Sequence, residues 1–364
     1  MMGTTWKPTA LAVSLCFLAG PIVYGFNNVA HTLSPLVILC AASAIMLSVT
    51  GVAVLCSAYV KNKMFYAFCL FAFTSTVDLF IPLELDGFVS GFMNVYLEAG
   101  EPYLKSAWGA IAAYWDGTFY LACYLMMAYK ASNGLSYRTL GLYYSANILN
   151  SMVVLLLGAV LSQSGVQWCT LLNIPYVVVP VIVGWQCLTE PRKKMVKPRA
   201  AGWVKTLLVL LLIEAAIAAV LRGVAGLGCN SDLFSWYRER AEPILSDILP
   251  APFAPIQAIV SLFYFAPAFL LLAAGIIQNP GQPWLQDLAI LVAGATLQAE
   301  VEQIGMSFHP LTIQQYQAPT LDNHMAWVAF WAVNILITVV PQLTVIILCW
   351  EPHTEHIKQR KKKQ

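Results

Sequence analysis

The chain has 364 residues, of which 59% are hydrophobic and 10% are charged, and its mean hydropathy is +0.69. A soluble globular domain carries about 25% charged residues, so this composition excludes a soluble protein and indicates a chain that crosses a membrane repeatedly. The net charge of +2 indicates no particular partner, and no basic-aromatic pattern points to nucleic acid.

Ten apolar runs are long enough to cross a bilayer, which takes about 20 residues per helix. Lipid offers the backbone no hydrogen bonds, so each run is predicted to be a helix. The predicted fold class is an all-α polytopic membrane protein with about ten transmembrane helices. The runs are residues 9–26, 33–59, 64–85, 108–129, 139–161, 168–188, 203–227, 253–277, 285–308 and 325–350.

Lysine and arginine set the predicted orientation. With ten crossings, the basic segments all fall on the side of the N-terminus, and the positive-inside rule makes that side the cytosol. Loops 86–107 and 228–252 are then lumenal. Loop 278–284 is the exception, because it is predicted to be cytosolic and has no lysine or arginine. The basic segments are loops 60–63, 130–138 and 189–205, and the C-terminal tail.

An internal repeat divides the chain. Residues 96–104, YLEAGEPYL, resemble residues 237–245, YRERAEPIL, and both lie between helices of the same orientation. We therefore expect two tandem related helical bundles, an arrangement in which sites lie within one half or between the halves. The predicted domains are an N-terminal helical hairpin (1–60), a first module (61–188), a basic cytosolic linker (189–202), a second module (203–350) and a cytosolic tail (351–364).

Two acidic residues of the first module, Asp78 and Asp116, lie within apolar runs, the second of them inside the sequence Tyr-Trp-Asp-Gly. An acid at bilayer depth costs several kcal/mol and is expected to face a bundle interior or a cavity. Two interpretations stand. The carboxylates line a pocket for an amine, a sterol hydroxyl or a lipid headgroup, or they only lock the bundle through hydrogen bonds. Glu84 and Asp86, which follow Pro82, fit the structural interpretation better.

The second module lacks this pattern, because its matching helix carries residues 261–265, SLFYF, with no acid. We therefore expect the pocket in the first module, with Asp116 as its polar anchor. Arg222 lies eight residues after Glu214, too far for a bridge along one helix, so its partner is expected elsewhere. The remaining polar residues near the end of run 285–308 are interpreted as one cluster at the membrane interface rather than as a proton relay. They are Glu300, Glu302, Gln303 and His309.

No nucleophile elbow, phosphate loop or metal-ligand cluster occurs in the sequence, so no catalytic residue, cofactor or metal is predicted. Seven of the nine cysteines lie inside apolar runs and are interpreted as packing residues. Cys169 and Cys229 lie near the ends of two apolar runs. The sequence does not decide whether they form a disulfide in an oxidising lumen.

The tail ends in Lys361-Lys362-Lys363-Gln364. Lysines at the third and fourth positions from the end resemble the di-lysine signal that coat proteins read when they return membrane proteins to the endoplasmic reticulum. Lys361 and Lys362 are therefore the candidate retrieval signal. A stop-transfer charge cluster is compatible with the same residues.

Five segments together resemble the transmembrane 6 superfamily, and within it the member 2 branch: FAFTSTVDL (71–79), GFMNVYLEAGEPYL (91–104), AAYWDGT (112–118), YRTLGLYY (137–144) and FHPLT (308–312). The resemblance implies two tandem modules of the fold shared by the emopamil-binding protein, a sterol isomerase, and the sigma-two receptor. It also implies residence in the endoplasmic reticulum membrane and the endoplasmic reticulum–Golgi intermediate compartment. The implied role is in loading triglyceride onto secreted lipoproteins and in lipid-droplet content.

Two departures limit what the resemblance implies. Phe234 stands about where family members carry a second cysteine after the one matching Cys229. The catalytic histidine and glutamates of the isomerase have no counterparts, and its helix-borne glutamate aligns near Trp108. The candidate ligand-binding residues are Asp78, Trp108, Tyr114, Trp115 and Asp116.

The sequence thus predicts a non-enzymatic lipid-handling protein that binds sterol, phospholipid or triglyceride and works with lipoprotein-assembly proteins. The alternative is an intramembrane sterol isomerase that uses acid-base chemistry. A paired acid and base facing one cavity would distinguish the isomerase, and no histidine or second carboxylate is expected at the depth of Asp116. A passive scaffold without a pocket is the third hypothesis.

Overall fold

The computed structural model describes residues 7–190 and 202–349. In these two stretches every regular element is helical, so the predicted all-α fold is confirmed. Most of the predicted linker lies outside the described residues. So do the predicted tail and the retrieval signal, Lys361 and Lys362.

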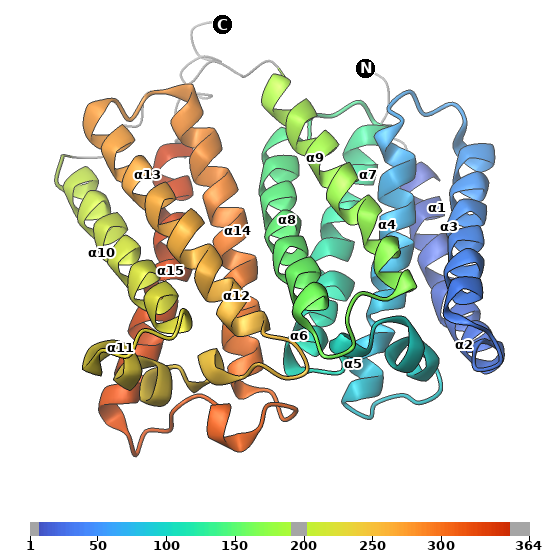
Figure 1. The fold of residues 1–364 in the computed structure, drawn as a ribbon. Helices are drawn as coiled ribbons and strands as arrows, with labels where there is room; N and C mark the ends of the chain where they lie inside the picture. The colour runs from blue at the N-terminus through green and yellow to red at the C-terminus, as the bar shows by residue number, and fades with distance from the viewer. Residues whose placement is uncertain (1–6, 191–201, 350–364) are drawn as a thin grey trace, which may run out of the picture.

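The first half of the chain forms two groups of helices, the N-terminal hairpin and the bundle beside it (Figure 1). The hairpin consists of α1 (Lys7–Phe17), α2 (Ala19–Ala30) and α3 (Pro35–Ser57). The bundle consists of α4 (Met64–Asp78), α5 (Phe80–Leu85), α6 (Ala107–Trp115), α7 (Leu121–Ser132), α8 (Arg138–Leu161) and α9 (Ile174–Thr189). Its short elements are the π-helical turns η1 (Tyr96–Gly100) and η3 (Asp116–Tyr120) and the 3-10 turns η2 (Pro102–Leu104) and η4 (Trp168–Asn173).

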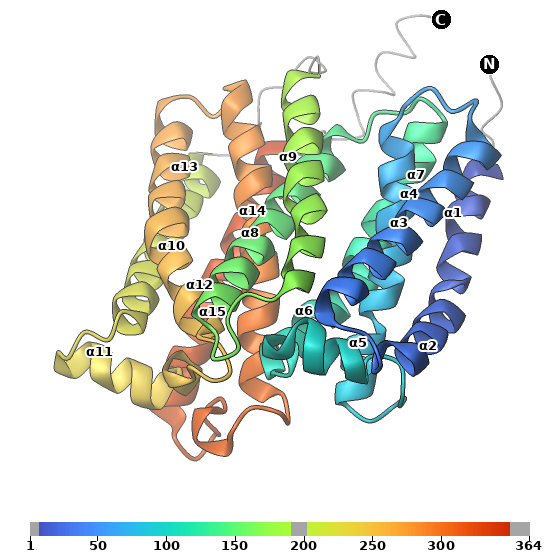
Figure 2. The same ribbon diagram turned by 45° about the vertical axis from the view of Figure 1, so that its right-hand side comes forward.

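The second half forms another bundle next to the first, as Figures 1 and 2 both show. Its helices are α10 (Gly202–Gly226), α11 (Asp232–Trp236), α12 (Phe253–Val260), α13 (Ala266–Gln278), α14 (Pro283–Phe308) and α15 (His324–Cys349). Its short elements are the π-helical turns η5 (Tyr237–Ala241) and η7 (Ser261–Phe265) and the 3-10 turns η6 (Pro243–Ser246) and η8 (Gln314–Tyr316).

All ten predicted runs are helical, and eight helices of the described chain are long and apolar enough to cross a membrane. The other two runs form α6–η3–α7 and α14, which lie alongside the eight (Figure 1). They are less apolar because they carry Asp116 in one case and Glu300 and Glu302 in the other. The eight are Lys7–Ala30, Pro35–Ser57, Met64–Leu85, Arg138–Leu161, Trp168–Thr189, Gly202–Gly226, Phe253–Gln278 and His324–Cys349.

The order of elements recurs between the two bundles. A π-helical turn that begins with tyrosine, η1 or η5, is followed in both by a 3-10 turn that begins with proline. Next comes a helix broken by a second π-helical turn, η3 or η7, and then the long helix α8 or α14. This recurrence supports the two predicted modules, whose boundaries we retain as a proposal.

The two bundles meet along α8 and α14, which are corresponding helices of the repeat. The backbones touch, because a Cβ added at Gly294 would lie 2.2 Å from the carbonyl oxygen of Tyr143. Polar side chains cross the same seam. Asn147 Nδ2 donates to the Gly294 carbonyl at 2.8 Å, and Asn150 Nδ2 donates to Gln257 Oε1 at 3.0 Å and to Gln298. The seam is thus closely packed and polar, as membrane helix interfaces commonly are.

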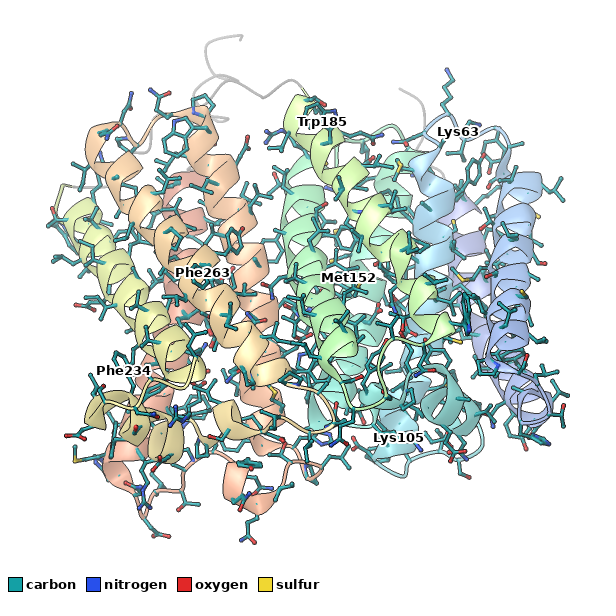
Figure 3. All side chains as sticks on the ribbon, in the orientation of Figure 1. Lys63, Lys105, Met152, Trp185, Phe234 and Phe263 are labelled. Atoms are coloured by element: carbon teal, nitrogen blue, oxygen red, sulfur yellow. The ribbon has the colours of Figure 1, made fainter. Side chains whose placement is uncertain are left out.

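Ten alternating crossings predict that loop 60–63 lies at one end of the molecule and that the two long loops, 86–107 and 228–252, lie at the other. Figure 3 agrees, with Lys63 at one end and Lys105 and Phe234 at the other. The assignment of the Lys63 end to the cytosol stays a prediction.

Closing the seam depends on the absence of a side chain at Gly294. We expect Gly294→Ala to destabilise the fold by about 1–3 kcal/mol, because the added methyl overpacks a backbone contact. Gly51→Ala is the matched control, since a Cβ there meets nothing within 4 Å, and in α3 it is expected to stabilise by about 0.4–1 kcal/mol. Thermal unfolding of the purified variants checks both, and equal melting temperatures would contradict the account of the seam.

Candidate functional site

A cavity of about 190 Å³ lies inside the first bundle, and α2 and α3 of the N-terminal hairpin form one of its walls. Most of its lining is apolar. Ile22 and Ile45 come from the hairpin, and Met152 comes from α8 at mid-height (Figure 3). Its acidic lining residues are Asp78, Glu101 and Asp116. The site is therefore an apolar chamber with a small acidic patch, the composition typical of a lipid or small-molecule pocket.

The backbone around Asp116 brings that patch together. Asp116 begins the π-helical turn η3 inside an otherwise α-helical segment, and such turns are frequent at functional sites. Gly117, the next residue, lies so close to α4 that an added Cβ would be 2.6 Å from the Leu79 Cβ. Glycine therefore lets the two helices approach until Asp78 and Asp116 meet. That close approach is a physical reason for the Asp-Gly pair of the sequence.

Asp78 and Asp116 lie next to each other on the cavity wall. Two carboxylates in one apolar site repel each other, so the pair favours a state in which one of them is protonated. Ser75 Oγ donates to Asp116 Oδ1, and the Tyr176 hydroxyl lies 3.3 Å from Asp78 Oδ2 and 2.6 Å from Thr74 Oγ1. The pair can hold and pass a proton at one place on the cavity wall.

The expectation that no second carboxylate lies at the depth of Asp116 is therefore wrong. The two helices run in opposite directions, so depth must be counted from the shared end. Asp78 lies seven residues before the end of α5 at Leu85, and Asp116 lies nine residues after the start of α6 at Ala107. Two residues of helix are only about 3 Å, so the carboxyl groups reach the same level.

Glu101 is the third acid of the cavity, and the sequence analysis did not select it. It is 2% exposed and accepts from the Tyr96 hydroxyl at 2.6 Å, from Asn173 Nδ2 at 2.6 Å and from the Tyr103 hydroxyl. Burial raises the pKa of Glu101, and the three donors oppose that rise because they stabilise the carboxylate. The internal repeat could have selected this residue, since Glu101 aligns with Glu242 of the second copy.

Three of the five predicted ligand-binding residues line the cavity: Asp78, Trp108 and Asp116. The other two make contacts elsewhere. The Tyr114 hydroxyl donates to Asp86 Oδ2 at 2.7 Å, and Trp115 Nε1 donates to Asn147 Oδ1 at 3.0 Å. Whether any of the five binds a ligand stays a prediction.

Glu84 has the structural role expected of it. Its carboxylate accepts from the backbone N–H groups of Gly91, Phe92 and Met93 at 2.8, 2.9 and 2.5 Å, which orders the loop after α5. Asp86 pairs with His309 Nε2 at 3.2 Å as well as with Tyr114, so it ties the two bundles together.

In the second bundle, a guanidinium lies beside the glutamate that corresponds to Glu101. Arg222 is fully buried; its Nε and Nη2 each lie 3.0 Å from an oxygen of Glu242, and its Nη1 bonds Glu300. Gln303 Nε2 at 2.9 Å and the Tyr237 hydroxyl at 2.7 Å also donate to Glu242, which therefore accepts from four donor atoms. The expectation that Arg222 pairs away from Glu214 is confirmed, and Glu214 itself is exposed on α10.

The expectation of one polar cluster near the end of α14 is wrong. Glu300 and Gln303 lie on one helix face and join Arg222, whereas Glu302 accepts from Trp108 Nε1 at 2.8 Å and Ser151 Oγ at 3.1 Å. Residues three apart share a helix face and residues two apart do not, so the group splits. His309, beyond the helix, bonds Asp86 instead.

Cys169 and Cys229 are both free thiols, so the disulfide left open by the sequence is not formed. Cys169 is buried against Ala30 and Ile38 of the hairpin, whereas Cys229 is exposed after α10. Their surroundings in different parts of the fold explain the separation. Among the described residues, no group of three or more acidic, histidine or cysteine side chains is arranged to hold a metal ion.

Comparison with known proteins identifies relatives. Residues 18–198 match the family described as "Transmembrane 6 superfamily member 2-like, transmembrane domain". The chain is 33% identical over 359 residues to "Transmembrane 6 superfamily member 2" of Mus musculus, with 93% of this chain and 92% of that protein covered. It is 33% identical over 356 residues to the Homo sapiens protein of that name, with 93% and 90% covered. No solved structure matches the chain significantly.

The Arg222 cluster supplies a stability prediction. We expect Arg222→Ala to destabilise the protein by about 3–5 kcal/mol, because Glu242 and Glu300 are left buried without their cation. Arg240→Ala, an exposed change in the same module, is the control and is expected to stay within about 0.5 kcal/mol. Thermal unfolding in detergent checks the difference, and similar melting temperatures for the two variants would show that the cluster is dispensable.

Proposed function

Because the chain belongs to the transmembrane 6 superfamily, we propose that it is a lipid-handling protein of the endoplasmic reticulum membrane that binds sterol or acyl lipid. The observation that carries the proposal is the apolar cavity of the first module with the Asp78–Asp116 pair on its wall. An apolar chamber between membrane-spanning helices suits a lipid, since the ligand exchanges one apolar environment for another. The acid pair offers a single polar anchor.

The chemistry of the anchor narrows the ligand class. A carboxyl pair that shares a proton both donates and accepts, so it matches a sterol hydroxyl or an ester carbonyl with an adjacent hydroxyl. Glu101 accepts from three donors of its own and is the third acid of the patch. Three acidic groups in one apolar cavity also make a cationic amphiphile a chemically suitable ligand.

In the cell, we propose that the bound lipid supports triglyceride loading onto secreted lipoproteins and lipid-droplet homeostasis. Lipoprotein-assembly proteins would be the partners on the lumenal side. Coat proteins would bind the tail through Lys361 and Lys362, which keeps the protein in the endoplasmic reticulum and the endoplasmic reticulum–Golgi intermediate compartment.

One observation favours a second candidate, an intramembrane sterol isomerase. Such an enzyme moves a proton onto one carbon and removes another, and the Asp78–Asp116 pair is a proton donor and acceptor facing an apolar cavity. To distinguish the isomerase from the non-enzymatic lipid-binding protein, the purified protein is incubated with a sterol that carries an isomerisable ring double bond. Product that forms with the wild-type protein and not with Asp116→Asn would favour the enzyme.

The binding prediction concerns Asp116. We expect Asp116→Asn to reduce co-purified lipid by about tenfold, because a hydrogen bond to a charged group contributes about 1.5–3 kcal/mol. Asp116→Ala is expected to reduce it at least as much. Mass spectrometry of lipids retained after gentle detergent purification gives the measurement, with thermal stability recorded alongside.

The matched control for Asp116 is Ser261→Ala, since Ser261 begins the corresponding π-helical turn of the second module. It should leave the bound lipid unchanged. Full retention of lipid by a stable Asp116→Asn protein would exclude the charge as the anchor. Wild-type protein that carries no lipid, with both Asp116 variants unstable, would assign Asp116 to the bundle alone.

The localisation prediction concerns the tail. Changing Lys361 and Lys362 together to serine should let the protein leave the endoplasmic reticulum, because the signal is read by a receptor and does not anchor the protein. Lys358→Ser with Arg360→Ser removes two charges but leaves the signal, and it should change nothing. Fluorescence microscopy checks both, and retention of the first variant would place the retention signal elsewhere in the chain.

A further inference from the structure

A second cavity, of about 210 Å³, lies between the two modules at the end of the molecule where Lys105 is found (Figure 3). The first module contributes residues 105–108 and Gln163 to its lining. The second module contributes residues from 244 to 254, together with Met306, Leu311 and Ile313. By the predicted topology this cavity, which we call the lumenal cleft, faces the lumen.

Trp108 is the residue that lines both the lumenal cleft and the cavity of the first module. Its indole is 2% exposed and stacks on Phe253, with ring centroids 4.1 Å apart and planes 14° apart. Phe253 lines the cleft only. Trp108 therefore borders both spaces, and Phe253 on the cleft side packs against its indole.

One hydrogen bond holds the indole in place. Trp108 Nε1 donates to Glu302 Oε2 at 2.8 Å, and Glu302 also accepts from Ser151, which lines the first cavity. Glu302 itself is fully buried and lines neither cavity, so Ser151 is the group bonded to it that a ligand in the first cavity can contact.

The neighbours of the indole are held in place by close contacts with the backbone. A Cβ added at Gly158 would lie 2.2 Å from Phe253 Cε1, so Phe253 is pressed against the backbone of α8. The start of α6 is also fixed, because Ser106 caps it through the Gly109 N–H at 3.1 Å and a Cβ at Gly109 would meet the Leu104 carbonyl oxygen at 2.2 Å. Because these neighbours are held, a path between the two cavities would have to open by rotation of the Trp108 side chain.

We propose that the lumenal cleft is a second subsite for the apolar chain of the lipid held in the first cavity, and that Trp108 is the gate between them. The inference rests on the proposed lipid binding. Met306, Ile313 and Phe253 give the cleft an apolar wall, while Lys105 and Asp247 belong to its polar part. The occupant is an acyl chain of a weakly polar lipid, which enters from the membrane cavity and is presented to the lumen.

The test uses the full-length protein in microsomes and a triacylglycerol analogue with a diazirine and an alkyne on one acyl chain. After irradiation, crosslinked peptides are identified by mass spectrometry. The wild-type protein should be labelled both in the first cavity, around Met152, and in the cleft, around Met306 and Ile313. Trp108→Ala should raise the cleft share severalfold, and Trp108→Phe, which keeps a ring but loses the bond to Glu302, should raise it less.

A blocking experiment does not depend on how Trp108 variants fold. Leu249 is 52% exposed and lines the cleft, so Leu249→Cys modified with a bulky maleimide should abolish cleft labelling and leave cavity labelling intact. Leu233→Cys is the matched control, because Leu233 is 59% exposed at the same end but outside the cleft lining. Both are made with the exposed Cys40, Cys56 and Cys229 replaced by serine.

Each result bears on a separate claim. Labelling of the first cavity without labelling of the cleft, in the wild type and in both Trp108 variants, would overturn the second subsite and leave the proposed lipid binding intact. Cleft labelling that neither Trp108 variant changes would overturn the gate. No labelling of the first cavity would contradict the proposed function itself.

Discussion

The fold depends on one constraint: an acid inside the bilayer needs a partner, because lipid supplies none. The two modules meet this constraint differently at corresponding places. The first places Asp78 beside Asp116, where Tyr176 and Ser75 donate to the two carboxyl groups, and leaves a cavity next to them. The second fills the space beside Glu242 with the Arg222 guanidinium. The same architecture therefore holds a chamber in one module and a closed ion-pair network in the other.

The repeat shows how such a difference can arise with little change to the backbone. Glu101 and Glu242 both follow a π-helical turn and both accept from the tyrosine that begins it, Tyr96 or Tyr237. The difference lies in the further donors, which are neutral around Glu101 and include a cation around Glu242. A buried arginine that bonds two glutamates and an asparagine rigidifies a bundle, so the second module is suited to a supporting role.

Hydropathy was enough to predict the helices, because a membrane span needs a long apolar run wherever it occurs. The motif around residues 96–104 predicted the repeat for a similar reason, since both copies build the same turn. Asp78 and Asp116 were both predicted to line the pocket, but their equal depth was missed, because depth in antiparallel helices must be counted from the end that the two helices share. Glu302 was misplaced because helix faces, rather than nearness in sequence, choose the neighbours of a side chain.

The seam between α8 and α14 explains why the cavity and the second module belong to one protein. Trp108 of the first module is held by Glu302 of the second, and Asp86 after α5 is held by His309 after α14. The second module contributes no residue to the lining of the first cavity, but it holds in place Trp108, which lines it. The Arg222 network fixes α14 through Glu300, so the carboxylate of Glu302 on the opposite face of that helix is kept where the indole needs it. The ion-pair network of the second module thus helps to set the position of Trp108 in the first.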